Sequence, residues 1–183
     1  MVRRFWEALL DLDETMSARI VLPPCARPFL KAVEYAVHGF PWIIAAVVTA
    51  VFAYSYRWAE KTQYGILVLI IGLVLDLAMI GLIKILVQRD RPSQNVDDQV
   101  FEAPIADRYS FPSGHTSRSA MLAVLLAHLC PPLTPLAVLL PLLVGYSRIA
   151  MGRHYVGDVI AGIALGVIEG FVVLCTPMAV NRW

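Results

Sequence analysis

Charged residues are scarce in this sequence. Asp, Glu, Lys and Arg make up only 16% of the 183 residues, and the formal net charge is +1. A nucleic-acid partner is not expected, because such partners are attracted by an extended basic field. Hydrophobic residues reach 58%, which is too apolar for an ordinary soluble domain. The composition indicates a chain embedded in a lipid bilayer, where any anion site is built from a few local cations.

Cysteine is also rare. The three cysteines, Cys25, Cys130 and Cys175, lie far apart and form no CxxC pair. Neither a disulfide framework nor a zinc site is therefore indicated. The acidic residues between positions 97 and 107 match no calcium-loop spacing. The sequence predicts no metal and no cofactor.

The first 36 residues alternate apolar and charged positions, and Pro23 and Pro24 divide them. Because proline cannot continue a helix, this pattern predicts two short amphipathic helices. Such helices lie in the plane of a membrane surface. We expect residues 1–36 to form a membrane-surface segment and residues 37–183 to form a transmembrane domain.

Five apolar runs follow, each long enough to cross a hydrocarbon core of about 30 Å. They extend from about Phe40 to Tyr56, Tyr64 to Val87, Ser113 to Cys130, Leu133 to Ala150 and Val156 to about Val180. The predicted fold is an all-α integral membrane bundle of about five transmembrane helices. Because successive crossings alternate in direction, the end of the second, the start of the third, the end of the fourth and the start of the fifth reach one membrane face.

Two cations mark the end of the second run. Lys84 and Arg91 are seven residues apart, or about two helical turns, so we expect both to project from one side of the helix before Pro92 ends it. Two fixed cations suit a phosphate dianion. The alternative is that both side chains simply anchor the helix end at the membrane surface.

The third run opens with Pro112-Ser113-Gly114-His115. Ser113 can cap the helix, Gly114 lets the backbone approach a ligand, and the free N–H groups of the first turn attract an anion. His115 would then lie over that anion. The alternative is an ordinary loop that ends in a helix cap.

A third polar group lies between the fourth and fifth runs, at Ser147-Arg148, His154 and Asp158. The i, i+4 spacing lets the Asp158 carboxylate reach one nitrogen of the His154 imidazole. The other nitrogen is then free to act as a nucleophile. The alternative is that Asp158 only complements the dipole of the helix that it begins.

Together the groups read Lys84-x6-Arg91-Pro92, Pro112-Ser113-Gly114-His115 and Ser147-Arg148-x5-His154-x3-Asp158. This ordered set resembles the signature of the type 2 phosphatidic acid phosphatase superfamily. The resemblance implies in-line attack by His154 on phosphorus, with Asp158 orienting the imidazole and His115 protonating the leaving oxygen. It also implies a set of phosphate-binding residues: Lys84, Arg91, Ser113, Gly114 and Arg148.

Further segments look like the polyisoprenoid (presqualene) diphosphate phosphatases, namely Arg27-Pro28-Phe29-Leu30-Lys31, His38-Gly39-Phe40-Pro41-Trp42, Tyr109-Ser110-Phe111 and Gly152-Arg153-His154. This likeness implies an isoprenoid diphosphate as the substrate, and residence in the endoplasmic reticulum or nuclear envelope. Two alternatives stay open, a lipid phosphotransferase and a noncatalytic membrane scaffold. The lipid tail, the preference for monophosphate or diphosphate, the membrane side of the site and the oligomeric state stay open as well.

Overall fold

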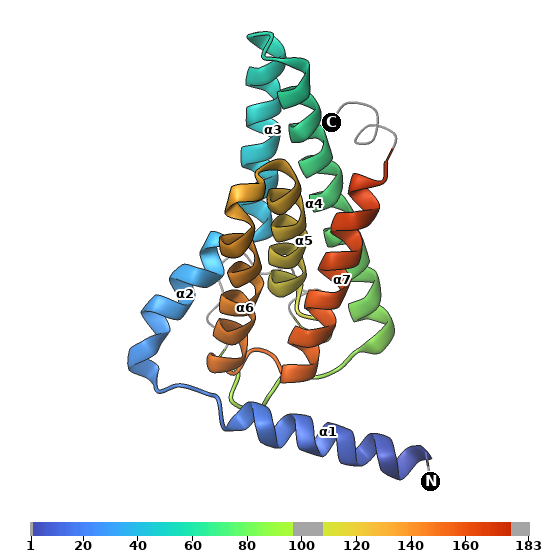
Figure 1. Cartoon of the computed structure of the whole chain (residues 1–183). Helices are drawn as coiled ribbons and strands as arrows, with labels where there is room; N and C mark the ends of the chain where they lie inside the picture. The colour runs from blue at the N-terminus through green and yellow to red at the C-terminus, as the bar shows by residue number, and fades with distance from the viewer. Residues whose placement is uncertain (1, 97–107, 177–183) are drawn as a thin grey trace.

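The computed structural model describes residues 2–96 and 108–176, and all regular structure in these ranges is helical. The chain forms an upright bundle with one helix lying across its end (Figure 1). The elements are α1 (Val2–Ala18), η1 (Pro24–Ala26), α2 (Arg27–Ala36), α3 (Gly39–Ser55), α4 (Glu60–Val87), α5 (Gly114–Leu129), η2 (Pro131–Leu133), α6 (Thr134–Ala150) and α7 (Val156–Leu174).

Two helices occupy the N-terminal segment, and the break between them contains Pro23 and Pro24 as predicted. Helix α1 lies across the end of the bundle at which α4 and α6 end and α5 and α7 begin (Figure 1). Several large apolar side chains of α1 are exposed, among them Phe5, Leu9, Leu12 and Met16. They recur three or four residues apart and so form one exposed apolar stripe, as an interfacial helix requires.

The transmembrane bundle agrees with the sequence in helix order and direction. Within the described residues, four stretches are long and apolar enough to cross a membrane: Arg27–Ser55, Glu60–Val87, Pro131–Ala150 and Val156–Leu174. Helix α7 ends at Leu174, earlier than the predicted end near Val180, which lies outside the described residues. The remaining predicted span corresponds to α5, which has only 16 residues and a length of about 24 Å.

Helix α5 packs against α4, α6 and α7. Its closest approach to α7 runs along glycines spaced four residues apart, at Gly162, Gly166 and Gly170. A Cβ atom at Gly162 would lie 2.6 Å from the Ser113 carbonyl oxygen, and one at Gly170 would lie 2.6 Å from the Val124 Cβ. Small residues of this kind let two membrane helices touch backbone to backbone. This contact places the start of α5 directly beside the start of α7.

Charged side chains are also buried in the middle of the bundle. Arg118 of α5 donates to Asp76 Oδ2 of α4 at 2.7 Å and to the Val37 carbonyl oxygen at 3.4 Å. Ser117 Oγ donates to Glu169 Oε2 of α7 at 3.2 Å. Carboxylates inside a membrane bundle need such partners, and these join three helices below the polar face.

Candidate active site

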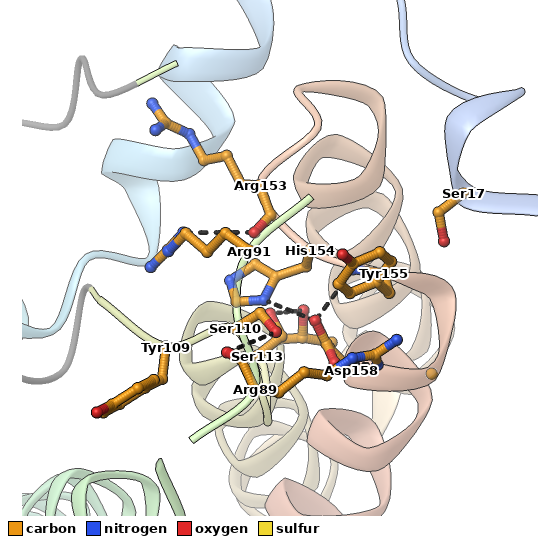
Figure 2. A network of polar contacts seen from close by, with 12 residues as sticks. Ser17, Arg89, Arg91, Tyr109, Ser110, Ser113, Arg153, His154, Tyr155 and Asp158 are labelled. Atoms are coloured by element: carbon orange, nitrogen blue, oxygen red, sulfur yellow. Dashed lines mark hydrogen bonds and ion pairs between the residues drawn. The ribbon is translucent and has the colours of Figure 1, made fainter. Parts of the chain in front are cut away.

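The polar groups predicted from sequence meet at the bundle end that α1 crosses. Lys84 comes from the last turn of α4, Ser113 to His115 from the start of α5, Arg148 from the last turn of α6, and Asp158 from the first turn of α7. His154 lies in the short turn between α6 and α7. Figure 2 shows His154 with Asp158 on one side and Arg91 on the other.

The helical register expected for Lys84 and Arg91 was wrong. Helix α4 ends at Val87, and Gln88 closes it in the left-handed conformation with φ of 51°. Arg91 therefore follows in a non-helical segment, as suits a residue before proline, which disfavours helical dihedrals. Both cations still reach the site: Lys84 Nζ donates to the Tyr109 carbonyl oxygen, and Arg91 Nη1 to the Arg153 carbonyl oxygen at 3.4 Å. Lys84 is buried, so it does not anchor the helix in lipid headgroups.

The turn that opens α5 differs from the prediction in one contact. Ser113 occupies the N-cap position, but its hydroxyl caps no backbone N–H and instead shares a 2.8 Å hydrogen bond with the Thr116 hydroxyl. The Ser113 N–H donates to the Asp158 carbonyl oxygen at 3.1 Å. Gly114 faces Ile80, whose Cγ2 would lie 3.2 Å from an added Cβ. The turn is thus fastened to the first turn of α7.

His115 lies against a second histidine. Its ring is 5.5 Å from that of His38, with an angle of 69° between the planes. Within the described residues, His115 Nε2 has no hydrogen-bond partner. A buried polar nitrogen without a partner is costly, and this one is available to a substrate oxygen.

His154 and Asp158 form the contact that their spacing predicts. His154 Nδ1 lies 3.4 Å from Asp158 Oδ2, and both side chains are buried, with exposures of 2% and 0%. At this length the contact is longer than an ordinary hydrogen bond. The same Oδ2 accepts a hydrogen bond from the Tyr155 N–H at 3.0 Å. The carboxylate is therefore held toward the imidazole by the helix that carries it.

The surroundings of His154 keep its ring neutral. Burial lowers the pKa of the imidazole well below its ordinary value of 6.5. The nearby positive charges of Arg148, Arg91 and Lys84 lower that pKa further. A neutral imidazole retains a lone pair for attack on phosphorus. The cations predicted to bind a phosphate thus also disfavour protonation of His154, the predicted nucleophile.

Sequence reasoning missed a carboxylate that enters the site from α2. Glu34 Oε1 lies 2.5 Å from Arg148 Nη1, and Glu34 Oε2 lies 3.2 Å from Arg153 Nη2. All three side chains are buried. Arg153 Nη1 also donates to the Val96 carbonyl oxygen at 3.2 Å. No local pattern marks Glu34, because its role depends on how α2 folds back against α6.

A second missed group connects α1 to the site. Arg89 pairs with Asp158 and with Asp13, which is placed on α1. Arg89 could have been suspected from its position two residues before Arg91, whereas nothing in the sequence near Asp13 indicates the contact. Within the described residues, no group of three or more His, Cys, Asp or Glu side chains could hold a metal ion.

Comparisons with known proteins converge on one family. The profile of the PAP2 superfamily matches residues 63–182. The chain is 31% identical over 134 residues to a probable lipid phosphate phosphatase beta of Arabidopsis thaliana, a match that covers 57% of this chain and 62% of that protein. It is 33% identical over 140 residues to decaprenylphosphoryl-5-phosphoribose phosphatase of Mycobacterium tuberculosis, covering 76% of this chain and 73% of that protein.

A solved structure shares the fold. The crystal structure of a transmembrane PAP2-type phosphatidylglycerolphosphate phosphatase from Bacillus subtilis superposes with a TM-score of 0.72 at 26% identity. The superposition covers 96% of this chain and 89% of the bacterial one.

Proposed function

Because this chain belongs to the PAP2 superfamily, we propose that it is an integral membrane phosphatase that hydrolyses a lipid phosphate or diphosphate through a phosphohistidine. The observation that carries the proposal is the state of His154. Its imidazole is buried and neutral, one nitrogen faces Asp158, and the cations that lower its pKa converge on it. That arrangement suits attack on an anion.

The proposed reaction has two in-line steps. A nitrogen of His154 attacks phosphorus, the bond from phosphorus to the leaving oxygen breaks, and its electron pair stays on that oxygen. His115 donates a proton to it. Lys84, Arg91 and Arg148, with the Ser113 hydroxyl and the Gly114 N–H, hold the equatorial oxygens and stabilise their charge. Water then attacks the phosphohistidine and releases inorganic phosphate.

We infer an isoprenoid lipid, with a diphosphate such as presqualene or farnesyl diphosphate preferred over phosphatidate. Support comes from the segments that look like polyisoprenoid diphosphate phosphatases, and from a mycobacterial relative named for a decaprenyl-linked phosphate. The relatives differ in their lipids, since the Bacillus subtilis structure is that of a phosphatidylglycerolphosphate phosphatase. Residence in the endoplasmic reticulum or nuclear envelope follows from the same inference.

The proposal also requires no metal, because arginine and lysine supply the positive charge. The test is to incubate the purified protein in detergent with farnesyl diphosphate, farnesyl monophosphate and phosphatidate, with and without excess chelator. We expect free phosphate in both conditions, most rapidly from an isoprenoid, and an acid-labile phosphoenzyme that is absent from His154→Ala. Activity lost in chelator and restored by magnesium would contradict the metal-free reaction.

The same assay separates the alternatives. A phosphotransferase would form a second phospholipid when an alcohol is added, with little free phosphate. A noncatalytic scaffold would form neither product and would give no phosphoenzyme with any of the three lipids.

A further inference from the structure

Arg89 lies between two carboxylates from opposite ends of the chain. Its Nη1 donates to Asp158 Oδ1 at 2.8 Å, and its Nη2 donates to Asp13 Oδ2 at 2.9 Å. The guanidinium carbon is 3.8 Å from the centre of the Tyr155 ring, so the group is also stacked (Figure 2). The planar fork of arginine suits this double pairing, which a lysine ammonium would not reproduce. The phosphatase reaction described above gives Arg89 no role.

The two oxygens of Asp158 have separate partners. Oδ1 is held by Arg89, whereas Oδ2 accepts from the Tyr155 N–H and faces His154 Nδ1. Because a carboxylate is planar, fixing Oδ1 also fixes the rotation that places Oδ2 against the imidazole. Asp158 is completely buried, and a buried carboxylate stays ionised at low cost only when it is paired. Arg89 therefore supplies both orientation and charge compensation.

Asp13 is itself anchored on the start of α7. The Gly157 N–H donates to Asp13 Oδ1 at 2.8 Å, and the Val156 N–H donates to Ser17 Oγ at 2.9 Å. Two N–H groups that the first turn of α7 leaves without helical partners are thus capped by side chains of α1. A Cβ at position 157 would lie 2.7 Å from Asp13 Oδ2, so glycine is needed for this approach.

We propose that Arg89 is a positioning residue, which orients the nucleophile His154 through Asp158. Asp13 of α1 in turn holds Arg89 in place. The chain of contacts runs from Asp13 to Arg89, to Asp158 and to His154. The inference rests on the proposed function, in which His154 attacks and Asp158 orients it. Arg89 acts through Asp158 and does not bind phosphate, so its loss lowers kcat and leaves the affinity for phosphate unchanged.

A double-mutant cycle tests this with the full-length protein in detergent. Arg89→Gln should lower kcat roughly tenfold to a hundredfold, the range typical of partners that orient a functional ligand, with KM and the inhibition constant of inorganic phosphate unchanged. In an Asp158→Asn background the same change should cost nothing further, because the group it positions has already lost its charge. Arg89→Lys keeps the charge without the fork and should restore part of kcat.

Asp13 provides a second cycle in which every variant keeps measurable activity. Asp13→Asn should lower kcat less than Arg89→Gln, and the double variant should be no slower than Arg89→Gln alone. Asp11→Asn is the matched control, since Asp11 is exposed on the same helix, and it should match the wild type. Asp13→Asn is nearly isosteric, which keeps the test valid if Arg89→Gln fails to fold.

Three outcomes would overturn the inference. Arg89→Gln could weaken phosphate inhibition, which would make Arg89 a binding residue. The reductions in kcat from the Arg89 and Asp158 changes, or from the Arg89 and Asp13 changes, could multiply in the double variant. Either result would indicate a general structural role for Arg89. Arg89→Gln could leave kcat unchanged. If instead Asp158→Asn is itself as active as the wild type, the proposed role of Asp158 fails, and this result differs from all three.

Discussion

Within the described residues, two clusters of buried and half-buried charged side chains differ in the balance of their charges. The bundle cluster, in the middle of the helices, has one cation and two acids, Arg118 with Asp76 and Glu169. The site cluster, at the end that α1 crosses, has five cations and three acids: Lys84, Arg89, Arg91, Arg148 and Arg153 with Asp13, Glu34 and Asp158.

The difference indicates what each cluster is for. A buried charge is tolerated when it is paired or hydrogen-bonded. In the bundle cluster Arg118 pairs with Asp76, and Glu169 accepts a hydrogen bond from Ser117. Among the described residues, the site cluster has two more cations than acids. A phosphate group carrying up to two negative charges would complete it. Burial alone therefore does not mark the proposed phosphate site, whereas an excess of positive charge does.

The largest expected effect concerns His115, at the same end of the bundle as the site cluster, and tests whether it acts in the chemical step or in phosphate binding. His115→Ala should lower kcat on farnesyl monophosphate about 10²- to 10⁴-fold, the usual contribution of a general acid. The loss on farnesyl diphosphate should be distinctly smaller. Taking ~15.7 for an alkoxide-like leaving group and ~6 for a phosphate, the diphosphate has the better leaving group by about ten pKa units. Equal losses, with chemistry rate-limiting, would make His115 a phosphate-binding residue.

The next largest effect is a loss of protein stability when the bundle cluster is changed. Arg118→Met removes the cation that pairs with the fully buried Asp76, so we expect a loss of about 3–5 kcal/mol. The measurement is the thermal or denaturant midpoint in detergent. Combining Arg118→Met with Asp76→Leu should recover much of the loss, because an apolar pair leaves no uncompensated charge. A double variant no more stable than the single one would contradict this account.

A smaller effect concerns pH. In the proposed reaction His154 must be neutral to attack. Its pKa lies well below 6.5, so kcat/KM should stay high as pH falls below that value and decline only when the ring protonates. Lys84→Met removes a cation that lowers the pKa of His154, and should move this decline toward higher pH while raising KM. Both proteins are measured with the same substrate, so that ionisation of the substrate affects the two pH profiles equally.

The control for that shift is Lys61→Met, an exposed lysine at the opposite end of α4. It should leave the pH profile and KM unchanged. A decline at the same pH in Lys84→Met and the wild type would show that Lys84 does not influence the nucleophile.

The smallest expected effect comes from a variant that increases the excess of positive charge in the site cluster. Glu34→Gln removes the acid that compensates Arg148 and Arg153, so inorganic phosphate should inhibit more strongly. We expect roughly tenfold, equivalent to about 1.4 kcal/mol. Glu7→Gln on the exposed surface of α1 is the control. Weaker inhibition by phosphate in Glu34→Gln would mean that Glu34 is needed to orient Arg148.

Much of this arrangement could be predicted from the sequence, because it follows from the lengths of the helices and the directions in which they cross the membrane. Apolar runs give the order of the crossings, and alternation brings the ends of α4 and α6 to the starts of α5 and α7. The spacing of four residues between His154 and Asp158 gives their contact, although His154 lies in the turn before α7 and not on the helix. These inferences require only helix lengths, directions and short sequence separations.

Other parts could not be predicted, because they depend on where segments dock. Arg91 was assigned to the helix by counting residues, but Gln88 ends α4 first and the backbone then turns. Glu34 and Asp13 lie in the segment that was predicted to lie on the membrane surface. Their contacts were missed because their partners lie more than sixty residues away in the sequence. Each belongs to a helix that packs against the bundle end, and no periodic pattern encodes that packing.

The shortness of α5 has a consequence for how the protein is made. With 16 residues and with Ser117, Arg118 and Ser119 buried along it, α5 lacks the apolar surface to enter a bilayer by itself. Arg118 lies in the second turn of α5, and a charged residue in a membrane helix opposes insertion, by up to about 2.5–3.5 kcal/mol for an arginine at the helix centre. We therefore expect α5 to wait at the insertion channel until α6 emerges and to enter as a hairpin with it. The helix that carries Ser113, Gly114 and His115 is then secured only together with its neighbours, so the site forms only when the bundle is complete.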